Sequence, residues 1–295
     1  MAGSTSSIPT AHGLSQAAGI SLPTAFVRLI LLAISRRGRR GYQHLTDRSL
    51  GILLAGPWQA AISGKSPAAH DIRYPQTPPE LVPFATQRVD GVHYGFIART
   101  PELPANDYAM GEFCPMDPDP VVFLATTFSK AIENLASQQL SYLRDDDEEL
   151  SESAAADLAR ISKLLKIAPS IRKAGRQFTR DGDARPIPLA KPRGYLFHKT
   201  LDGIGVLAPK AAFARAALGH DTDDLASGIK RSIKLLAADC PASALVILKD
   251  LWWARCHDPT AIARVAPPFA DAYRALNRPA FAEIVNDKAR RVKAR

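Results

Sequence analysis

Two short apolar runs, residues 81–85 and 92–98, flank a polar stretch that ends in the pair Asp90-Gly91. Short runs bounded by turn-forming residues are typical of β-strands, and Asp-Gly suits a turn that needs a positive φ. The pattern therefore predicts a β-hairpin. Five prolines within residues 74–103 stiffen the two ends of this hairpin.

Alternation along the second run divides its side chains between two faces of the sheet. One face carries Val92, Tyr94 and Phe96, and the other carries His93, Gly95 and Ile97. We expect the sheet to bury the first face and to leave the second more accessible.

Further strands and helices follow from the same patterns. Residues 110–114 and 121–125 are short apolar runs on either side of a proline-rich turn, so they predict two more strands. A second hairpin is predicted over 195–208, around Asp202-Gly203. Apolar residues recur at helical spacing elsewhere, which predicts helices over 21–34, 127–143 and 155–168.

The last third of the chain has a helical pattern. Helices are expected over 209–219, 223–239, 241–256, 259–266, 269–277 and 279–292. Pro241, Pro259 and Pro279 each stand at the start of one of them, where the first turn accepts proline. The connections are short, so neighbouring helices are expected to pack antiparallel in a compact bundle.

These patterns predict an α+β fold, with a small mixed or antiparallel sheet and flanking helices followed by a region of short antiparallel helices. At 295 residues and 46% hydrophobic content, the chain is long enough for two domains. We expect a disordered tail over 1–20, an α+β domain over 21–143, an acidic connector over 144–155, a helix plus hairpin over 156–208 and an α-helical region over 209–295.

Composition bears on membrane association, on cellular location and on the state of the cysteines. The longest apolar run near the start, residues 29–34, is far shorter than the roughly 20 residues that span a bilayer, so no membrane association is expected. Residues 1–16 contain no Lys or Arg, which fits a secretory signal poorly, and we expect a cytoplasmic protein. Three cysteines without CxxC spacing predict reduced thiols, and neither a metal nor a cofactor is expected.

His93, Glu112, Asp117 and Asp119 are the strongest candidates for chemistry. The predicted strands can bring them to one end of the sheet, and an imidazole beside carboxylates is what general base catalysis or metal binding needs. This cluster supports an alternative function as a hydrolase or transferase. Polar residues are common on strands and turns, however, so no catalytic residue is assigned and a non-catalytic protein is favoured.

Residues 203–209 match the dinucleotide-binding fingerprint GxGxxA. Pro209 falls where the phosphate-binding helix should run, and no βαβ unit surrounds the match. The hairpin is therefore the better interpretation of this segment.

The formal net charge of +9 makes nucleic acid a second candidate partner. The basic cluster consists of Arg36, Arg37, Arg39 and Arg40. It is not interleaved with aromatic residues, and no DNA-reading helix-turn-helix accompanies it, so a solvated face is favoured over a nucleic-acid site. A nucleic-acid-associated protein remains a further alternative function.

Trp252 and Trp253 are neighbours in a predicted helix. Adjacent helical side chains point about 100° apart, so one indole can enter the core while the other lies at its margin. Trp253 is a candidate for partner contact, because tryptophan at a core margin favours interfaces.

The segments 22–30 (LPTAFVRLI), 90–98 (DGVHYGFIA) and 112–135 resemble the SUKH superfamily in element order and in a loose Gly-Tyr/His strand motif. The resemblance covers residues 21–143. It implies a helix led by a Leu-Pro pair, a sheet with a ligand-facing surface, and a closing helix. Many bacterial members neutralise toxin domains and fungal relatives are regulatory adaptors, so the resemblance implies protein binding without catalysis.

The positions that this resemblance places on the binding surface are His93, Tyr94, Glu112 and Asp117. We therefore expect an adaptor or immunity-like protein that binds another protein through its sheet face. A basic chain is poorly suited to a basic nuclease toxin, so a general adaptor role is favoured over toxin neutralisation.

Overall fold

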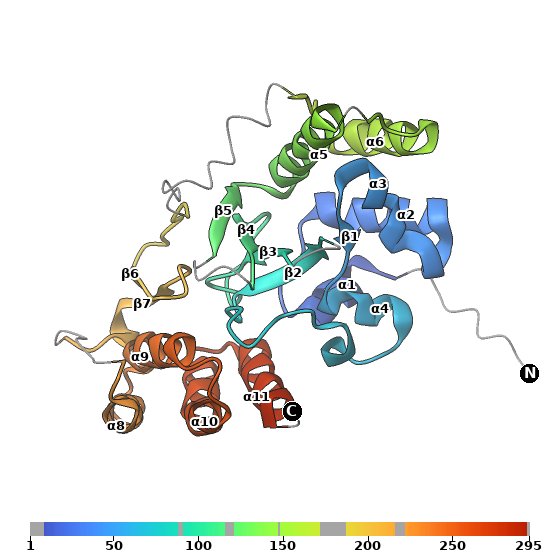
Figure 1. The fold of residues 1–295 in the computed structure, drawn as a ribbon. Helices are drawn as coiled ribbons and strands as arrows, with labels where there is room; N and C mark the ends of the chain where they lie inside the picture. The colour runs from blue at the N-terminus through green and yellow to red at the C-terminus, as the bar shows by residue number, and fades with distance from the viewer. Residues whose placement is uncertain are drawn as a thin grey trace, which may run out of the picture.

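The protein has an α+β fold built around a five-stranded antiparallel sheet (Figure 1). The computed structural model describes residues 9–87, 91–115, 121–146, 148–171, 187–215 and 222–293. The strands follow one another in the sheet in chain order: β1 (Leu53–Leu54), β2 (Leu81–Thr86), β3 (His93–Ile97), β4 (Met110–Phe113) and β5 (Val122–Ala125). In Figure 1 the sheet lies in the middle, with α5 and α6 above it and the C-terminal helices below.

The predicted hairpin is confirmed in β2 and β3, which pair from Leu81↔Ile97 to Thr86↔His93. Its turn residues 88–90 lie outside the described part of the chain. The predicted division of the side chains between two faces is also confirmed. Tyr94 and Phe96 enter the main core, where their face meets an aromatic cluster that includes Phe26, Phe84 and Phe128.

The expectation that the second face is more accessible is wrong. His93 is 0% exposed and Ile97 only 5%. This face forms a smaller core of its own, in which the C-terminal half of the chain contributes Ile204 and the half-buried Trp253. Apolar side chains on both faces of a sheet are stabilised only when both are removed from water, and the C-terminal region provides the second cover.

The predicted disordered tail over 1–20 is wrong across its described part. Residues 11–18 form α1 (Ala11–Ala18), which Thr10 caps through its side chain and which buries Leu14 completely. Gly19 ends the helix in the left-handed conformation, and a Cβ there would lie 2.7 Å from Cβ of Ala280. Contact with the far end of the chain therefore orders a segment whose own composition is that of a tail.

The predicted helix over 21–34 is confirmed in α2 (Thr24–Gly41), whose helical geometry is interrupted at Gly38 with φ 69°. The N-cap is Pro23, and no side chain makes a cap hydrogen bond at this end. Short elements then lead to β2: η1 (Tyr42–Leu45), α3 (Asp47–Leu50), η2 (Pro57–Gln59), α4 (Ala60–Ser63) and η3 (Pro67–His70).

Two amphipathic helices close this half of the molecule. The helix α5 (Phe128–Asp145) begins after Thr127, whose hydroxyl accepts a hydrogen bond from the Lys130 N–H. The helix α6 (Glu152–Leu165) has Ser151 as its N-cap. Both predicted helices are confirmed. The acidic connector predicted over 144–155 overlaps both of them, because α5 ends at Asp145 and α6 begins at Glu152.

The second hairpin is confirmed as a separate two-stranded sheet of β6 (Tyr195–His198) and β7 (Val206–Pro209). The helix predicted over 209–219 is wrong in its described part. Only the short η4 (Lys210–Ala212) forms, and Phe213 is extended and buried. The Ala214 N–H donates to Oγ of Ser243 instead of continuing a helix, so a tertiary contact replaces the local one.

The C-terminal region consists of α8 (Leu225–Ala237), α9 (Pro241–Ala254), α10 (Pro259–Ala275) and α11 (Pro279–Lys293). Each of the three helices predicted to begin at a proline does so. The two helices predicted over 259–266 and 269–277 are one helix, because α10 runs through Pro267 and Pro268. The buried face of α10 continues without a break across the two prolines and includes Val265, Phe269 and Tyr273. Packing of this face against the core offsets the unfavourable effect of proline inside a helix.

No helix in the described part of the chain combines the length and the apolar composition that crossing a bilayer requires.

Candidate functional site

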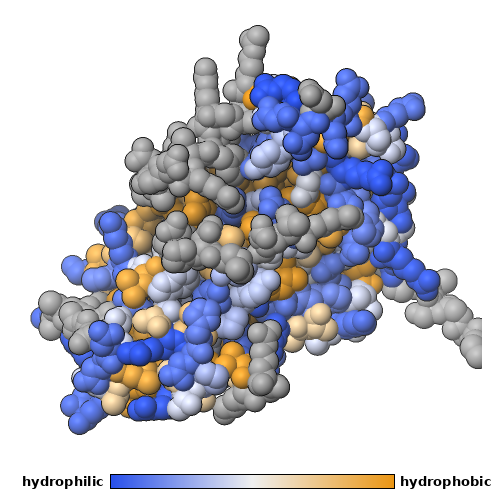
Figure 2. Space-filling view, viewed as in Figure 1, coloured by the Kyte–Doolittle hydropathy of each residue, from blue (hydrophilic) through white to orange (hydrophobic). Residues whose placement is uncertain are grey.

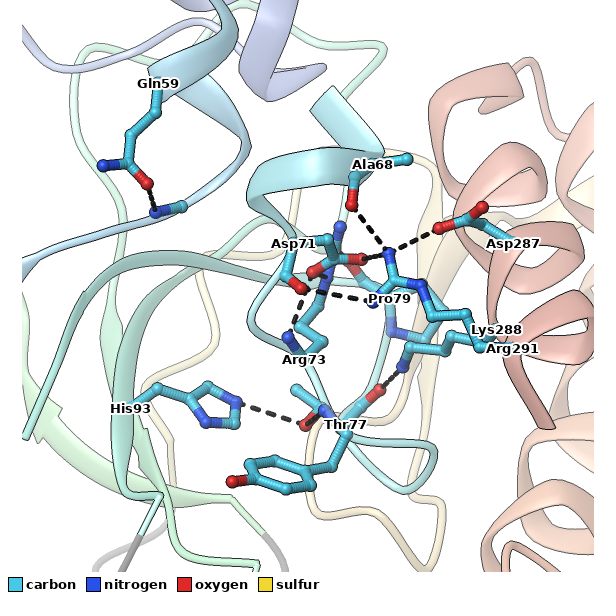
Figure 3. Close-up of polar contacts among 12 residues, drawn as sticks. Gln59, Ala68, Asp71, Arg73, Thr77, Pro79, His93, Asp287, Lys288 and Arg291 are labelled. Atoms are coloured by element: carbon cyan, nitrogen blue, oxygen red, sulfur yellow. Dashed lines mark hydrogen bonds and ion pairs between the residues drawn. The ribbon is translucent and has the colours of Figure 1, made fainter. Parts of the chain in front are cut away.

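His93 lies at the centre of a buried polar contact between β3 and the loop that precedes β2 (Figure 3). Its Nδ1 is 3.2 Å from the Gly91 carbonyl oxygen and its Nε2 is 3.1 Å from Oγ1 of Thr77. A carbonyl only accepts, so Nδ1 carries the proton and Nε2 accepts from the Thr77 hydroxyl. The ring stacks on Tyr74 at 6.0 Å and meets Phe113 at 5.1 Å between centroids.

Burial lowers the pKa of His93 from 6.5 to about 4, and the charges of Lys288 and Arg73 act in the same direction. The hydrogen bond to Gly91 and the charge of Asp71 oppose this shift without cancelling it. His93 is therefore a neutral core residue at pH 7, fixed by two hydrogen bonds.

Glu112 does not share the face of His93. In the β3–β4 register Glu112 stands opposite Tyr94, whereas His93 stands opposite Phe113. Directly opposed residues project to the same side of a sheet, so Glu112 lies with Tyr94 on the other face. Asp117 and Asp119, the remaining members of the predicted cluster, lie outside the described residues.

Tyr94 is also buried, with 1% of its surface exposed, and its hydroxyl receives a hydrogen bond from Gln87 at 2.8 Å.

The prediction that one of the two adjacent tryptophans enters the core while the other lies at its margin is confirmed. Trp252 is buried and donates from Nε1 to the Pro75 carbonyl at 2.8 Å, while the half-buried Trp253 packs edge-on against Phe113.

The arginine cluster lies at the end of α2, around the kink at Gly38. Arg37 is paired with Asp157 of α6, with 2.5 Å between Nη2 and Oδ2. Arg160 reaches the other oxygen of the same carboxylate at 3.2 Å. At least part of the predicted basic patch is therefore engaged in holding α2 against α6.

The sequence interpretation did not identify the group of charged residues that surrounds the loop after η3. Asp71 Oδ1 accepts hydrogen bonds from the Arg73 backbone N–H at 3.1 Å and from Nε of Arg73 at 2.7 Å. Nη1 of Arg73 donates to the Pro79 carbonyl at 3.3 Å. Both charged side chains are almost fully buried, at 2% exposure for Arg73 and 3% for Asp71.

The last helix completes this group with two cations one turn apart. Lys288 Nζ donates to the Thr77 carbonyl oxygen, and Arg291 donates to the carbonyls of Ala68 at 3.0 Å and Asp71 at 3.2 Å (Figure 3). Arg291 also pairs with Asp287 on its own helix. More than 200 residues separate the two sides of the contact, so no local spacing in the sequence marks them as partners.

Lys288 has a strongly altered acidity. Burial, together with the charges of Arg73 and Arg291, lowers its pKa from 10.5 to about 7, although the charges of Asp71 and Glu80 oppose the shift. For Asp71, burial alone would raise the pKa, but the charge and hydrogen bonds of Arg73 and the charge of Lys288 bring it below the ordinary value.

Two cavities adjoin the Asp71–Arg73 pair. One, of about 220 Å³, lies between the loop and α11 and is lined by Asp71, Arg73, Tyr74, Lys288 and Arg291 among others. The other, of about 310 Å³, extends toward α1 and Arg290.

A second buried network joins the sheet to the C-terminal helices. Lys249 Nζ of α9 is 2.6 Å from Glu80 Oε2 and 2.9 Å from Asp202 Oδ2, and Tyr273 of α10 donates to Glu80 Oε1 at 2.7 Å. Burial would lower the pKa of Lys249, but the two carboxylates outweigh it and raise the value. Burial and the charge of Glu80 raise the pKa of Tyr273. Lys249 offsets part of the negative charge of the two carboxylates, and the charge of Arg99 also acts on both.

The described residues contain no group of three or more His, Cys, Asp or Glu side chains that could hold a metal ion. No family model matches the sequence, and no curated protein matches it either.

Proposed function

We propose that the protein is a non-catalytic adaptor that binds another protein, as the resemblance of residues 21–143 to the SUKH superfamily implies. The supporting observation is a pair of apolar side chains at the surface beside the sheet, here called the junction patch: Leu201 and Trp253. Leu201 is 47% exposed and Trp253 is half-buried, whereas Val122, 41% exposed, stands opposite Glu112 and projects to the other face of the sheet. Apolar side chains that gather at one place on a surface are typical of protein interfaces.

The two residues come from different elements, which hydrogen bonds hold to each other and to the sheet. The Val121 N–H donates to the Asp202 carbonyl at 3.3 Å, which fixes the start of β5 to the turn of the second hairpin. The Leu201 N–H donates to Asp250 of α9 at 2.7 Å, one helical turn before Trp253. Figure 2 shows hydrophobic residues at the surface in several separate places on the face in view.

The strand β5 adds a second means of recognition. It is the last strand in the order of the sheet, and no strand in the described part of the chain pairs with its outer edge. Backbone groups at such an edge can hydrogen-bond to an extended segment of a partner while nearby pockets and apolar side chains give specificity. The proposed partner is therefore a protein with an extended apolar segment.

The test compares partner capture by matched surface variants. Purified wild-type protein, Leu201→Asp, and Ile233→Asp are each used to capture proteins from native lysate, followed by quantitative mass spectrometry. Ile233 on α8 is 52% exposed and lies outside the junction patch, so its variant controls for a lost surface hydrophobe. A partner retained by Ile233→Asp and lost by Leu201→Asp supports the proposal, and equal capture by both variants contradicts it.

A hydrolase or transferase centred on His93 is not favoured. The imidazole is buried, its two nitrogens have partners, and Glu112 lies on the opposite face of the sheet. A nucleic-acid function is not favoured either, because Arg37 is already paired with Asp157.

A further inference from the structure

We propose that the cavity between residues 71–75 and α11 is a binding site for a small oxyanion of the sulfate, phosphate or carboxylate class. This site is separate from the junction patch and does not depend on the proposed adaptor function. Its walls bring together side chains from the loop after η3 and from the last helix, more than 200 residues apart in the sequence.

Charge is the first argument for an anion. Of the described residues that line the cavity, Arg73, Lys288 and Arg291 are basic and Asp71 is the one carboxylate. As whole residues, Arg73 and Lys288 are 7% and 2% exposed, so water screens their charges little. Asp71 and Asp287, which pairs with Arg291, balance the charges of the two arginines, so the excess positive charge is that of Lys288 when it is protonated. A buried charge without compensation is unfavourable, and an anion in the cavity would compensate it.

The geometry of the donors is the second argument. Arg guanidinium groups offer several N–H donors in a fixed plane that suits carboxylate and phosphate oxygens. The Arg73 side chain is locked by Asp71 and Pro79, and Arg291 is held by the carbonyls of Ala68 and Asp71. These contacts fix both guanidinium groups at the cavity wall, so little side-chain freedom is lost when a ligand binds.

Size restricts the ligand class. The volume of about 220 Å³ is below the roughly 300–1,000 Å³ of pockets that hold drug-sized molecules. An ion of the size of sulfate or a short dicarboxylate fits this volume, whereas a nucleotide does not.

Proton uptake should accompany binding, because Lys288 is the group most sensitive to a new charge. The groups around it are Arg73, Asp71 and the Thr77 carbonyl on the loop, Glu80 at the start of β2, His93 on β3, Cys256 after α9, and Arg291 on its own helix. In the free protein its pKa is about 7, and a bound anion favours the protonated amine. Affinity should therefore fall as the pH rises above 7, by up to roughly ten-fold per pH unit.

The experiment is isothermal titration calorimetry of the full chain with sodium sulfate and, separately, sodium malonate. Sodium chloride at equal ionic strength is the reference, and the titrations cover pH 6–9 in two buffers of different ionisation enthalpy. Sulfate has no titration of its own in this range, so any proton uptake belongs to the protein. The variants are Arg291→Gln and Lys288→Met, with Arg290→Gln as the matched control, because the Arg290 side chain is 68% exposed and lines the other cavity.

We expect saturable binding of an oxyanion at millimolar concentration or below, with proton uptake at pH 7–8. Arg291→Gln should weaken it by at least about ten-fold, Arg290→Gln should leave it unchanged, and Lys288→Met should abolish the proton uptake. Sulfate binding without malonate binding would assign the site to tetrahedral anions, and the reverse would assign it to carboxylates. Any one of three results would overturn the proposal: neither sulfate nor malonate shows saturable binding, Arg290→Gln weakens binding as much as Arg291→Gln does, or an anion binds without proton uptake. If Lys288→Met does not fold, the arginine variants and the wild-type proton uptake still decide it.

Discussion

Lys249 is a buried ammonium group that pairs with two carboxylates from distant parts of the chain. Lys249→Met should lower the free energy of unfolding by about 3–5 kcal/mol, because Glu80 and Asp202 would remain buried without the ammonium group that pairs directly with both. Urea unfolding at pH 7 measures this loss. Tyr273→Phe is the control, since it removes one hydrogen bond to Glu80 and should cost only about 1–3 kcal/mol. Equal losses in the two variants would show that the lysine charge is not what stabilises the network.

His93 should make stability depend on pH in the acid range. Its pKa in the folded protein, about 4, is below the ordinary 6.5, so the unfolded chain binds the proton first as the pH falls. Stability is unaffected by this group above pH 6.5 and should decrease by about 3 kcal/mol between pH 6.5 and pH 4.

Urea unfolding of wild-type protein, His93→Gln and His257→Gln at several pH values between 4 and 7 checks this expectation. His93→Gln should remove most of the dependence, whereas His257→Gln, at an exposed position, should preserve it. A wild-type curve that is flat between pH 4 and 6.5 would contradict the neutral, buried state of His93.

The sequence predicted the facing of individual side chains but not their exposure. Period-two alternation placed Tyr94 and His93 on opposite faces, because that relation depends only on the local backbone. Whether a face is covered depends on residues such as Ile204 and Trp253, more than 100 positions away. The Asp71–Lys288–Arg291 group could not be predicted for the same reason. Its members are more than 200 residues apart, and neither their charge nor their local spacing indicates that they meet.

At the scale of elements, α10 contains a local conflict at Pro267 and Pro268. Pro267 is exposed, so Pro267→Ala removes a helix-breaking residue without loss of core packing. The substitution should raise the free energy of unfolding by about 2 kcal/mol, because the roughly 3 kcal/mol cost of an interior proline exceeds the roughly 1 kcal/mol that proline gains by restricting the unfolded chain. Thermal unfolding compares it with Pro259→Ala, at the first turn of the same helix, which should bring no gain. Stabilisation by both variants would mean that position in the helix does not decide the effect.

Element prediction succeeded where hydrophobic periodicity and end signals agreed, as in α5 with its Thr127 cap and in the helices that start at Pro241 and Pro279. It failed where a tertiary contact overrode the local signal. The buried side of α10 continues through two prolines, and the packing of α1 orders a segment of tail-like composition. The segment after β7 also lost its predicted helix to contacts with α9.

At the scale of the whole molecule, the two halves of the chain share their cores. A fragment of residues 9–143 would expose the sheet face formed by Leu81, Ile97, Phe113 and Val121, and would leave Glu80 without Lys249. We expect this fragment to aggregate or to bind a hydrophobic dye strongly. The full chain should bind little dye and should unfold in one calorimetric transition. A monomeric fragment with native-like, cooperative unfolding would instead support an independent domain over 21–143.

The order in which the chain is synthesised gives the buried Glu80–Lys249 pair a further consequence. A ribosome completes the whole five-stranded sheet before it adds Lys249, 169 residues after Glu80. At elongation rates of roughly 5–20 residues per second, the completed sheet, which ends at Ala125, waits about 6–25 seconds for Lys249 with an apolar face uncovered, and the Glu80 carboxylate waits about 8–34 seconds for its partner. Such a nascent chain is a natural client for ribosome-associated chaperones, and its yield in cells should depend on their supply more than its final stability suggests.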